Sequence, residues 1–485
     1  MLGSRIRFVL FINGLLLISL SAAMALPMVV DFTSGSQDWR TFAMSAGATL
    51  YGGGMLILAC RGEGARVDQQ TGYLLTTSAW LVIGVFASLP LFLSTTLGLS
   101  YTDAFFETMS GLTTTGSTVI VGLDLLPPGL LLWRSLLQWF GGIGIVVMAI
   151  LLLPVLRTGG MQLFRTESSD ISGKPMHLQQ MVGLTIAAYV GLSVACAIAY
   201  GIAGMNTFDA INHAMTTLAT GGYSTKDASI GFYDSVAIEL VSIVFMVAGA
   251  LPLIWYTRLV RERGDKTRSE GQQVAVLLAI LLVAVLLATA WNIYANSMPF
   301  GAALRVSAFN VTSVLTDTGF ATADFSGWGS FAVGLFFSLY LVGGCAGSTA
   351  GAIKIFRWQI LFAGLFRQLK LMFEPHRVLL TRYGNQIVDD ETMHSVRNFF
   401  FMYMNTLLVL SLLVMATGVD FLSSISAVAQ AMANAGPGLG PIGGPAGNFS
   451  TMPDTAKWLL VAAMLLGRLE LATIYVLLLV DYWRS

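Results

Sequence analysis

The chain has 485 residues, of which 55% are hydrophobic and only 11% charged, with zero formal net charge at pH 7 and a mean hydropathy of +0.74. This composition excludes a soluble globular domain, and no nucleic-acid partner is expected. Apolar runs long enough to cross a bilayer recur along the whole length, which predicts a single membrane domain.

The first two runs, Phe8 to Met24 and Thr41 to Cys60, predict an antiparallel pair of membrane helices. The alternative for the first run is a secretory signal peptide, because Arg5 and Arg7 precede it and Ala-Met-Ala follows at 23–25. The second run follows at once, so we interpret the two as a helix pair.

Lys and Arg cluster in alternate loops along the rest of the chain. The loops between these clusters hold neither residue, so the positive-inside rule places both termini in the cytoplasm. Ten crossings are expected. After the first pair they are residues 72–97, 129–156, 178–203, 233–258, 272–293, 328–370, 395–416 and 456–481.

The outward gaps between the later spans each hold an apolar stretch too short to cross the membrane, and the four stretches resemble one another. They run from Asp103 to Gly116, Asp209 to Gly221, Ser307 to Gly319 and Ser424 to Gly436, the first being one residue longer. The four glycines lie 105, 98 and 117 residues apart. This spacing predicts a fourfold internal repeat.

A helix of about twelve residues rises ~18 Å, roughly half of a ~30 Å hydrocarbon core, so each stretch enters the membrane without crossing it. With Asp103, Asp209, Ser307 and Ser424 as N-caps at the outer surface, four partially negative C-termini converge on one axis. The chain then returns through non-helical backbone, whose freedom the four glycines supply and whose carbonyls can replace the hydration shell of a cation. The sequence therefore predicts a cation pore. Alternatively, the glycines are plain helix C-caps in outer loops. We interpret Asp103, Glu107 and Asp209 as helix caps rather than ion ligands.

The segment from Trp328 to Lys370 would be ~64 Å long as one helix, about twice the membrane thickness, so it must break. The break is expected at Gly343-Gly-Cys-Ala-Gly-Ser-Thr-Ala-Gly351, and we predict an intramembrane loop there that blocks or opens the pore. Alternatively, Gly343, Gly347 and Gly351 form a helix-packing face. The predicted gate-loop residues are Gly344, Cys345, Ala346, Gly347, Ser348, Thr349 and Gly351.

Two basic residues fall where a charge is costly. Arg468 lies well inside the last span and Lys354 follows the predicted loop, so both are predicted to line the inner cavity and to form a barrier to cations. The alternative is a structural ion pair or snorkelling. Arg134, near the outer end of its span, is interpreted as a snorkelling residue.

Several motifs resemble the TrkH-type subunit of bacterial Trk potassium uptake systems, within the Trk/Ktr/HKT superfamily of K+ transporters. The resemblance covers essentially the whole chain. The motifs are Thr113-Thr-Thr-Gly116-Ser-Thr, Ala219-Thr-Gly-Gly-Tyr-Ser-Thr225, Thr316-Asp-Thr-Gly319-Phe, Asn434-Ala-Gly436-Pro-Gly and Gly344-Cys-Ala-Gly-Ser-Thr-Ala-Gly351.

The resemblance implies K+ uptake across the inner (cytoplasmic) membrane, because glycine at the filter position of every repeat is associated with K+ selectivity and serine in the first with Na+ permeation. It also implies a homodimer, and gating by a cytoplasmic ring of nucleotide-binding, TrkA-type subunits, which Arg258 to Arg268 and Arg357 to Arg397 could contact. K+ is the transported ion, and no organic cofactor is expected in this chain. The implied filter residues are Thr114, Thr115, Gly116, Thr220, Gly221, Thr318, Gly319, Ala435 and Gly436, with K+ at Thr115, Thr220, Thr318 and Asn434.

The predicted fold is an all-α membrane protein of four linked repeats, each a membrane helix (M1), a pore helix and a second membrane helix (M2). The expected units are the N-terminal pair (1–70) and the repeats 71–175, 176–270, 271–390 and 391–485. The rival function is a solute or cation symporter with a midplane site, which predicts inverted or paired repeats. An enzyme is not expected, because the spans hold no catalytic cluster and neither the three cysteines nor the four histidines show metal-ligand spacing. A carbonyl filter serves passive and H+- or Na+-coupled flux alike.

Overall fold

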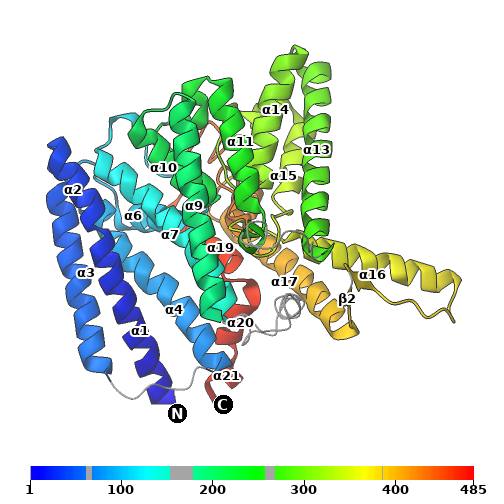
Figure 1. The fold of residues 1–485 in the computed structure, drawn as a ribbon, viewed down its shortest axis with the longest axis horizontal. Helices are drawn as coiled ribbons and strands as arrows, with labels where there is room; N and C mark the ends of the chain where they lie inside the picture. The colour runs from blue at the N-terminus through cyan, green and yellow to red at the C-terminus, as the bar shows by residue number, and fades with distance from the viewer. Residues whose placement is uncertain (1, 62–67, 153–177, 257–267, 385, 485) are drawn as a thin grey trace.

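The chain folds into a bundle of helices with both termini at the same end (Figure 1). The computed structural model describes residues 2–61, 68–152, 178–256, 268–384 and 386–484. Two short strands, β1 (Arg382–Tyr383) and β2 (Gln386–Ile387), pair in antiparallel fashion, and the regular structure is otherwise helical in the described ranges. The predicted all-α fold is confirmed.

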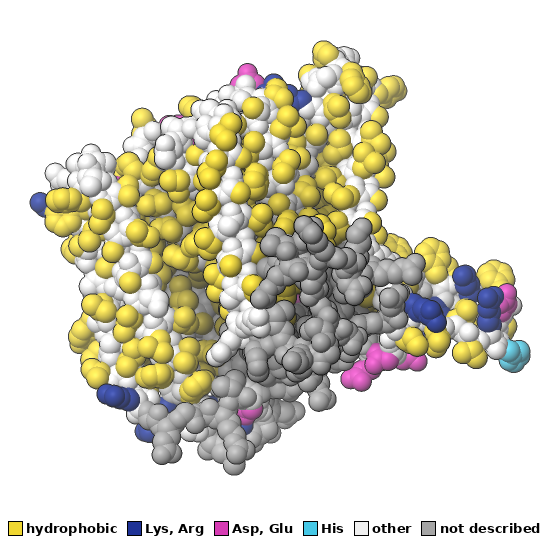
Figure 2. Space-filling model, in the orientation of Figure 1, with side chains coloured by type: hydrophobic (Ala, Val, Ile, Leu, Met, Phe, Trp, Pro, Cys, Tyr) yellow, Lys and Arg dark blue, Asp and Glu magenta, His cyan; other side chains and the backbone are white. Residues whose placement is uncertain are grey.

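Hydrophobic side chains cover the sides of the bundle, whereas the charged side chains in view gather at its two ends and on the projecting helix α16 (Figure 2). Among the described residues, seven helices are long and apolar enough to cross a bilayer, and the pair α19 and α20, bent by 112°, makes an eighth. The other two expected crossings contain shorter helices. Residues 233–258 hold the 15-residue α11, and residues 328–370 are divided between α15 and α16.

The N-terminal helices form a closely packed pair at one side of the bundle. A Cβ atom on Gly14 would lie 2.9 Å from the carbonyl oxygen of Gly53, and one on Gly53 would lie 2.9 Å from that of Gly14. Small residues thus let the two backbones touch. Asp31 joins the pair to the first repeat, because its Oδ1 accepts a 2.6 Å hydrogen bond from the amide of Gly129. The helices are α1 (Leu2–Ala23), α2 (Ala25–Ser34) and α3 (Trp39–Cys60).

Repeats 1 and 2 each consist of an M1 helix, a 12-residue pore helix and an M2 helix. In repeat 1 they are α4 (Gln69–Ala87) with α5 (Leu89–Leu93), α6 (Tyr101–Leu112) and α7 (Pro128–Leu152), and η1 (Leu123–Leu125) precedes α7. In repeat 2 they are α9 (Leu178–Ile202), α10 (Thr207–Leu218) and α11 (Val236–Ala250), and η2 (Ser229–Tyr233) precedes α11.

Repeats 3 and 4 have the same order, but their M2 segments are broken. In repeat 3 the elements are α13 (Arg268–Asn296), α14 (Phe300–Leu315), η3 (Phe325–Trp328), α15 (Ser330–Leu339) and α16 (Ile355–Phe373). In repeat 4 they are α17 (Asp390–Met415), α18 (Phe421–Ala433), α19 (Asp454–Arg468), α20 (Leu471–Leu478) and α21 (Val480–Arg484).

The pore helices begin earlier than the sequence predicted, so the four expected N-caps are wrong. Ser100 and Asn206 cap α6 and α10, and their side chains accept hydrogen bonds from the amides of Asp103 and Asp209, which lie in the first turn. Asp420 caps α18 in the same way through the amide of Ser423. A cap one turn upstream satisfies these amides and adds a turn of helix.

The other two expected caps lie inside helices. Ser424 belongs to the first turn of α18, and Ser307 is buried within α14. Helix α14 is longer than predicted because it starts directly after Pro299, whose fixed φ suits the start of a helix.

Candidate functional site

All four pore helices end in the same backbone turn. A residue with left-handed φ, between 49° and 58°, follows each helix, and two residues later comes a glycine with φ between 74° and 91°. The left-handed residues are Thr114, Thr220, Asp317 and Asn434, and the glycines are Gly116, Gly222, Gly319 and Gly436.

The hydrogen bonds give the same register. In each repeat the residue after the left-handed position donates its amide to a carbonyl in the last two turns of the pore helix, at 2.8–3.0 Å. The pairs are Thr115 with Ser110, Gly221 with Thr216, Thr318 with Ser313, and Ala435 with Gln430.

The expected register of repeat 2 is therefore wrong by one residue. Gly222, not Gly221, is equivalent to Gly116, Gly319 and Gly436. Gly221 and Gly222 are adjacent, so the sequence alone did not show which of them belongs to the turn. Choosing Gly221 also made the stretch of repeat 1 appear one residue longer than that of repeat 2. The C-cap alternative is also wrong, because these glycines lie beyond the left-handed residues that end the helices.

The four turns meet one another in chain order. A Cβ atom on Gly116 would lie 2.1 Å from the oxygen of Gly221, and one on Gly222 would lie 2.0 Å from the oxygen of Thr318. A Cβ atom on Gly319 would lie 2.8 Å from the oxygen of Ala435. Repeat 4 closes the ring on repeat 1, since the Ser117 hydroxyl donates to the oxygen of Gly436 at 3.0 Å. The four segments thus surround one point.

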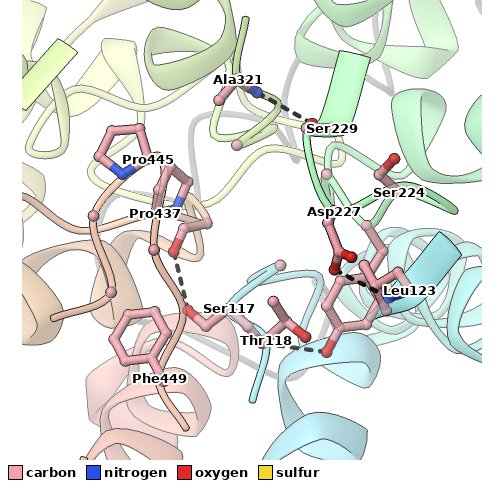
Figure 3. Close-up of a pocket in the computed structure, with 18 of the residues that line it drawn as sticks. Ser117, Thr118, Leu123, Ser224, Asp227, Ser229, Ala321, Pro437, Pro445 and Phe449 are labelled. Atoms are coloured by element: carbon pink, nitrogen blue, oxygen red, sulfur yellow. Dashed lines mark hydrogen bonds between the residues drawn. The ribbon is translucent and has the colours of Figure 1, made fainter. Parts of the chain in front are cut away.

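A pocket opens above this ring, and Figure 3 shows Ser117, Ser224, Ala321 and Pro437 from the four repeats around it. Its lining includes all four equivalent glycines, so the ring lies at the pocket wall. The residues that line the pocket also include a basic and an acidic one, Lys226 and Asp227.

The residues predicted to hold K+ lie at two levels of the ring. Thr115 and Thr318 follow the left-handed position, whereas Thr220 and Asn434 occupy it. Side chains connect the levels across repeats, because the Asn434 amide donates to the Thr115 hydroxyl at 2.9 Å. The predicted set therefore mixes two registers.

A buried ion pair supports the ring from behind. The Arg134 Nε lies 2.9 Å from the Glu107 carboxylate, and their side chains are 1% and 0% exposed. Glu107 also accepts hydrogen bonds from the amide of Val119 at 2.8 Å and from the Thr118 hydroxyl at 3.1 Å. Both expectations were wrong here: Arg134 does not snorkel, and Glu107 caps no helix but binds the chain that leaves the ring of its own repeat.

Helix α7 also holds the turn of repeat 2 through side chains one helical turn apart. Arg134 donates to the oxygen of Ser224 at 3.0 Å, and its guanidinium lies 4.0 Å from the centroid of the Tyr223 ring. Gln138 donates to the oxygen of Gly221 at 2.6 Å and accepts from the amide of Tyr223 at 3.0 Å. Sequence reasoning missed Gln138, although a polar residue one turn from Arg134 in an apolar span was a signal.

The segment between α15 and α16 is non-helical and lies against the ends of the pore helices. The Thr349 hydroxyl lies within hydrogen-bond distance of the oxygens of Leu218 and Gly249, at 2.9 and 3.0 Å. The amide of Ala352 donates to the oxygen of Ala433 at 2.9 Å. The helix-packing alternative for Gly343, Gly347 and Gly351 is therefore wrong, because this segment forms no helix.

Both predicted cavity charges contact this segment. Arg468 is 4% exposed and donates to the oxygen of Thr349 at 2.8 Å and to that of Gly141 at 3.3 Å. Lys354 donates to the oxygen of Ala350. Each cation thus binds one carbonyl of this segment in the described conformation.

Known proteins match this architecture over its full length. Residues 41–482 match the TrkH family, described as cation transport proteins. The chain belongs to the TrkH family. It is 41% identical over 480 residues to the Trk system potassium uptake protein TrkI of Halomonas elongata. The aligned region covers 98% of this chain and 97% of that protein. It is 37% identical to the TrkH protein of Escherichia coli K12, which covers 99% of each chain.

The fold is also that of a solved member of the TrkH family. The crystal structure of the potassium transporter TrkH from Vibrio parahaemolyticus superposes with a TM-score of 0.90 at 35% identity and covers 99% of both chains. The predicted layout of four repeats behind an N-terminal helix pair is confirmed. Because this family consists of transport proteins, the expectation that the chain is not an enzyme is also confirmed.

Proposed function

We propose that this protein takes up K+ across the bacterial cytoplasmic membrane through a pore on the axis of its four repeats. The observation that carries the proposal is the ring of equivalent turns, in which four short helices end, in the same geometry, around one point beneath an open pocket. Helix C-termini carry partial negative charge, and backbone carbonyls can replace the hydration shell of a cation. Potassium uptake by the named relatives supports K+ as the ion.

The selectivity filter in this proposal consists of the four turns, with Gly222 in place of the predicted Gly221. Glycine then occupies the equivalent position of every repeat, as expected for K+ selectivity in proteins that this chain resembles. The other proposed filter residues are Thr114, Thr115, Gly116, Thr220, Gly221, Thr318, Gly319, Ala435 and Gly436, with Asn434 and Asp317 at the left-handed positions of repeats 4 and 3.

The gate in this proposal is the loop of residues 344–351. Its contacts with Leu218, Gly249 and Ala433 support this role, because a chain bound to the inner ends of two pore helices obstructs the exit from the ring. Few of its backbone bonds belong to regular structure, which suits a segment that moves. We infer that the described conformation is closed.

Replacing Arg468 by alanine is expected to raise single-channel K+ conductance at least about twofold. The substitution removes a positive charge from the proposed cation pathway and the hydrogen bond that holds the oxygen of Thr349. Recordings from planar bilayers with the purified protein measure the effect. Equal conductance in wild type and variant would contradict the barrier role.

Orientation and partners complete the proposal. Both termini face the cytoplasm, as the distribution of Lys and Arg predicts. In this proposal the protein forms a homodimer, and a cytoplasmic ring of nucleotide-binding subunits contacts the basic inner segments. Of these, Arg357 to Arg397 includes the projecting helix α16 (Figure 2), whereas residues 257–267 lie outside the described ranges.

Rubidium uptake by cells that lack their own K+ uptake systems tests the function. Cells that express this protein are expected to accumulate Rb+ and to grow at low K+ concentration, and cells that express Gly116→Ser are expected to admit Na+ as well. The matched control is Gly98→Ser, because Gly98 has a similar positive φ of 57° but lies in an open outer loop. Absence of Rb+ uptake by membrane-inserted protein, with its partner subunit present, would count against the proposal.

A further inference from the structure

Repeat 3 departs from the other three repeats at the left-handed position of its filter turn. Asp317 stands there, whereas the equivalents are Thr114, Thr220 and Asn434. Its side chain is fully buried, and neither carboxylate oxygen has a hydrogen-bond partner of ordinary geometry among the described residues. An ionised carboxylate in such a place is costly unless a cation compensates it, and a carboxyl group without that compensation is protonated instead.

The equivalent side chains show which space this position faces. In repeat 2 the Thr220 hydroxyl lies 3.3 Å from that of Thr349 in the proposed gate loop. In repeat 4 the Asn434 amide reaches the Thr115 hydroxyl of repeat 1. By the fourfold relation of the turns, Asp317 lies at the same level, between the ring of glycines and the loop.

Two cationic side chains act electrostatically on this carboxyl group, and neither forms an ion pair with it within 4 Å. Burial opposes the ionised form of Asp317, whereas Lys354, the backbone amide of Gly351 and Arg468 favour it. Lys354 directly follows the loop, and its ammonium group donates a hydrogen bond to the oxygen of Ala350. Arg468 is held at the oxygen of Thr349. Lys354 is therefore joined to the loop, which withdraws in the proposed gating, whereas Arg468 belongs to α19 and Asp317 to the filter turn.

We propose that Asp317 is a cation-binding carboxylate at the inner end of the filter. The ammonium group of Lys354 neutralises it when the loop is closed, and K+ neutralises it when the loop withdraws. The proposal rests on the proposed pore function. Withdrawal of the loop removes the compensating charge from a site that water and K+ can then reach, so a permeant monovalent cation replaces the tethered one. K+ and Lys354 thus compete for one carboxylate, and K+ binding favours the open pore.

Flux measurements on the full-length protein in liposomes test this competition. The initial rate of K+ uptake, followed with Rb+ as a tracer at a fixed ratio to K+, is measured against K+ concentration for wild type, Asp317→Asn, Lys354→Gln and the double variant. Asp317→Asn is expected to raise the half-saturating K+ concentration about tenfold, because one attractive charge is lost, and to raise the maximal rate because the closed loop loses one of its attachments. Lys354→Gln is expected to raise the maximal rate as well but to lower the half-saturating concentration.

The double variant decides whether the two residues form one unit. Its maximal rate is expected to equal that of either single variant, since both substitutions break the same interaction. Multiplying effects would overturn the proposal. Wild-type constants in Asp317→Asn would also overturn it, because they would show that the carboxyl group is neutral in the protein.

Two control variants distinguish a role of this particular carboxylate from a general effect of lost charge or lost folding. Asp324→Asn makes the same chemical change at an exposed position of repeat 3 and is expected to keep wild-type constants. Asp317→Glu retains the charge and is expected to keep the half-saturating concentration within about threefold of wild type, which a loss of folding would not allow. If wild type itself moves no K+, the proposed function fails, whereas wild-type flux with unchanged Asp317→Asn constants refutes only this inference.

Discussion

Gly222→Ala is expected to lower K+ flux on the order of 100-fold, whereas Gly221→Ala lowers it less than about tenfold. Gly222 has φ 74°, and a Cβ atom there would lie 2.0 Å from the oxygen of Thr318 in the next repeat, so backbone of the ring itself must move. Gly221 has no positive φ, and its Cβ atom would meet the end of the Gln138 side chain, whose displacement costs two hydrogen bonds but moves no backbone of the ring.

Rb+ flux into liposomes, normalised to the amount of folded protein, measures both effects. The comparison is sharp because the two glycines are adjacent and the substitutions identical. A larger loss in Gly221→Ala than in Gly222→Ala would contradict the register found in the structure and restore the one that the sequence predicted.

Arg134→Met is expected to lower the free energy of unfolding by about 3–5 kcal/mol, because it leaves the Glu107 carboxylate buried without its countercharge. The double variant Glu107→Gln/Arg134→Met removes both charges and is expected to recover more than half of the loss. Equilibrium unfolding in mixed detergent micelles measures these differences.

The control for this pair is Arg377→Met. Arg377 pairs with Glu374 at 2.7 Å, but both side chains are more than half exposed, so its loss is expected to cost at most about 1 kcal/mol. Equal destabilisation by Arg134→Met and Arg377→Met would show that the buried pair does not stabilise the ring.

The architecture could be predicted from the sequence because each of its signals is local. Apolar runs, four short apolar stretches and the glycine-rich break in residues 328–370 follow directly from chain composition, and the structure shows the corresponding elements. The turn glycines of repeats 1, 3 and 4 could also be predicted, because each stands alone after its helix.

The remaining features depend on contacts between segments distant in sequence. Whether Gly221 or Gly222 belongs to the ring is decided by the left-handed φ of Thr220, which the two adjacent glycines concealed. Arg134 resembled a snorkelling residue because its partner Glu107 lies on a different helix. Glu107 resembled a cap because the helix start at Tyr101 could not be placed from sequence alone.

The rival symporter function predicted inverted or paired repeats around a midplane site. The structure has instead four turns with equivalent hydrogen bonds, which contact one another in chain order around a single point. This arrangement favours an axial pore.

The most direct test of the pore is the reversal potential of the purified full-length protein in a bilayer with K+ on one side and Na+ on the other. A K+-selective filter predicts a reversal potential displaced toward the K+ equilibrium potential. Replacing K+ by Rb+ is expected to change this potential little, and Gly116→Ser is expected to reduce its displacement. A reversal potential near zero for K+ against Na+, or no cation current at all with the regulatory partner present, would contradict the account.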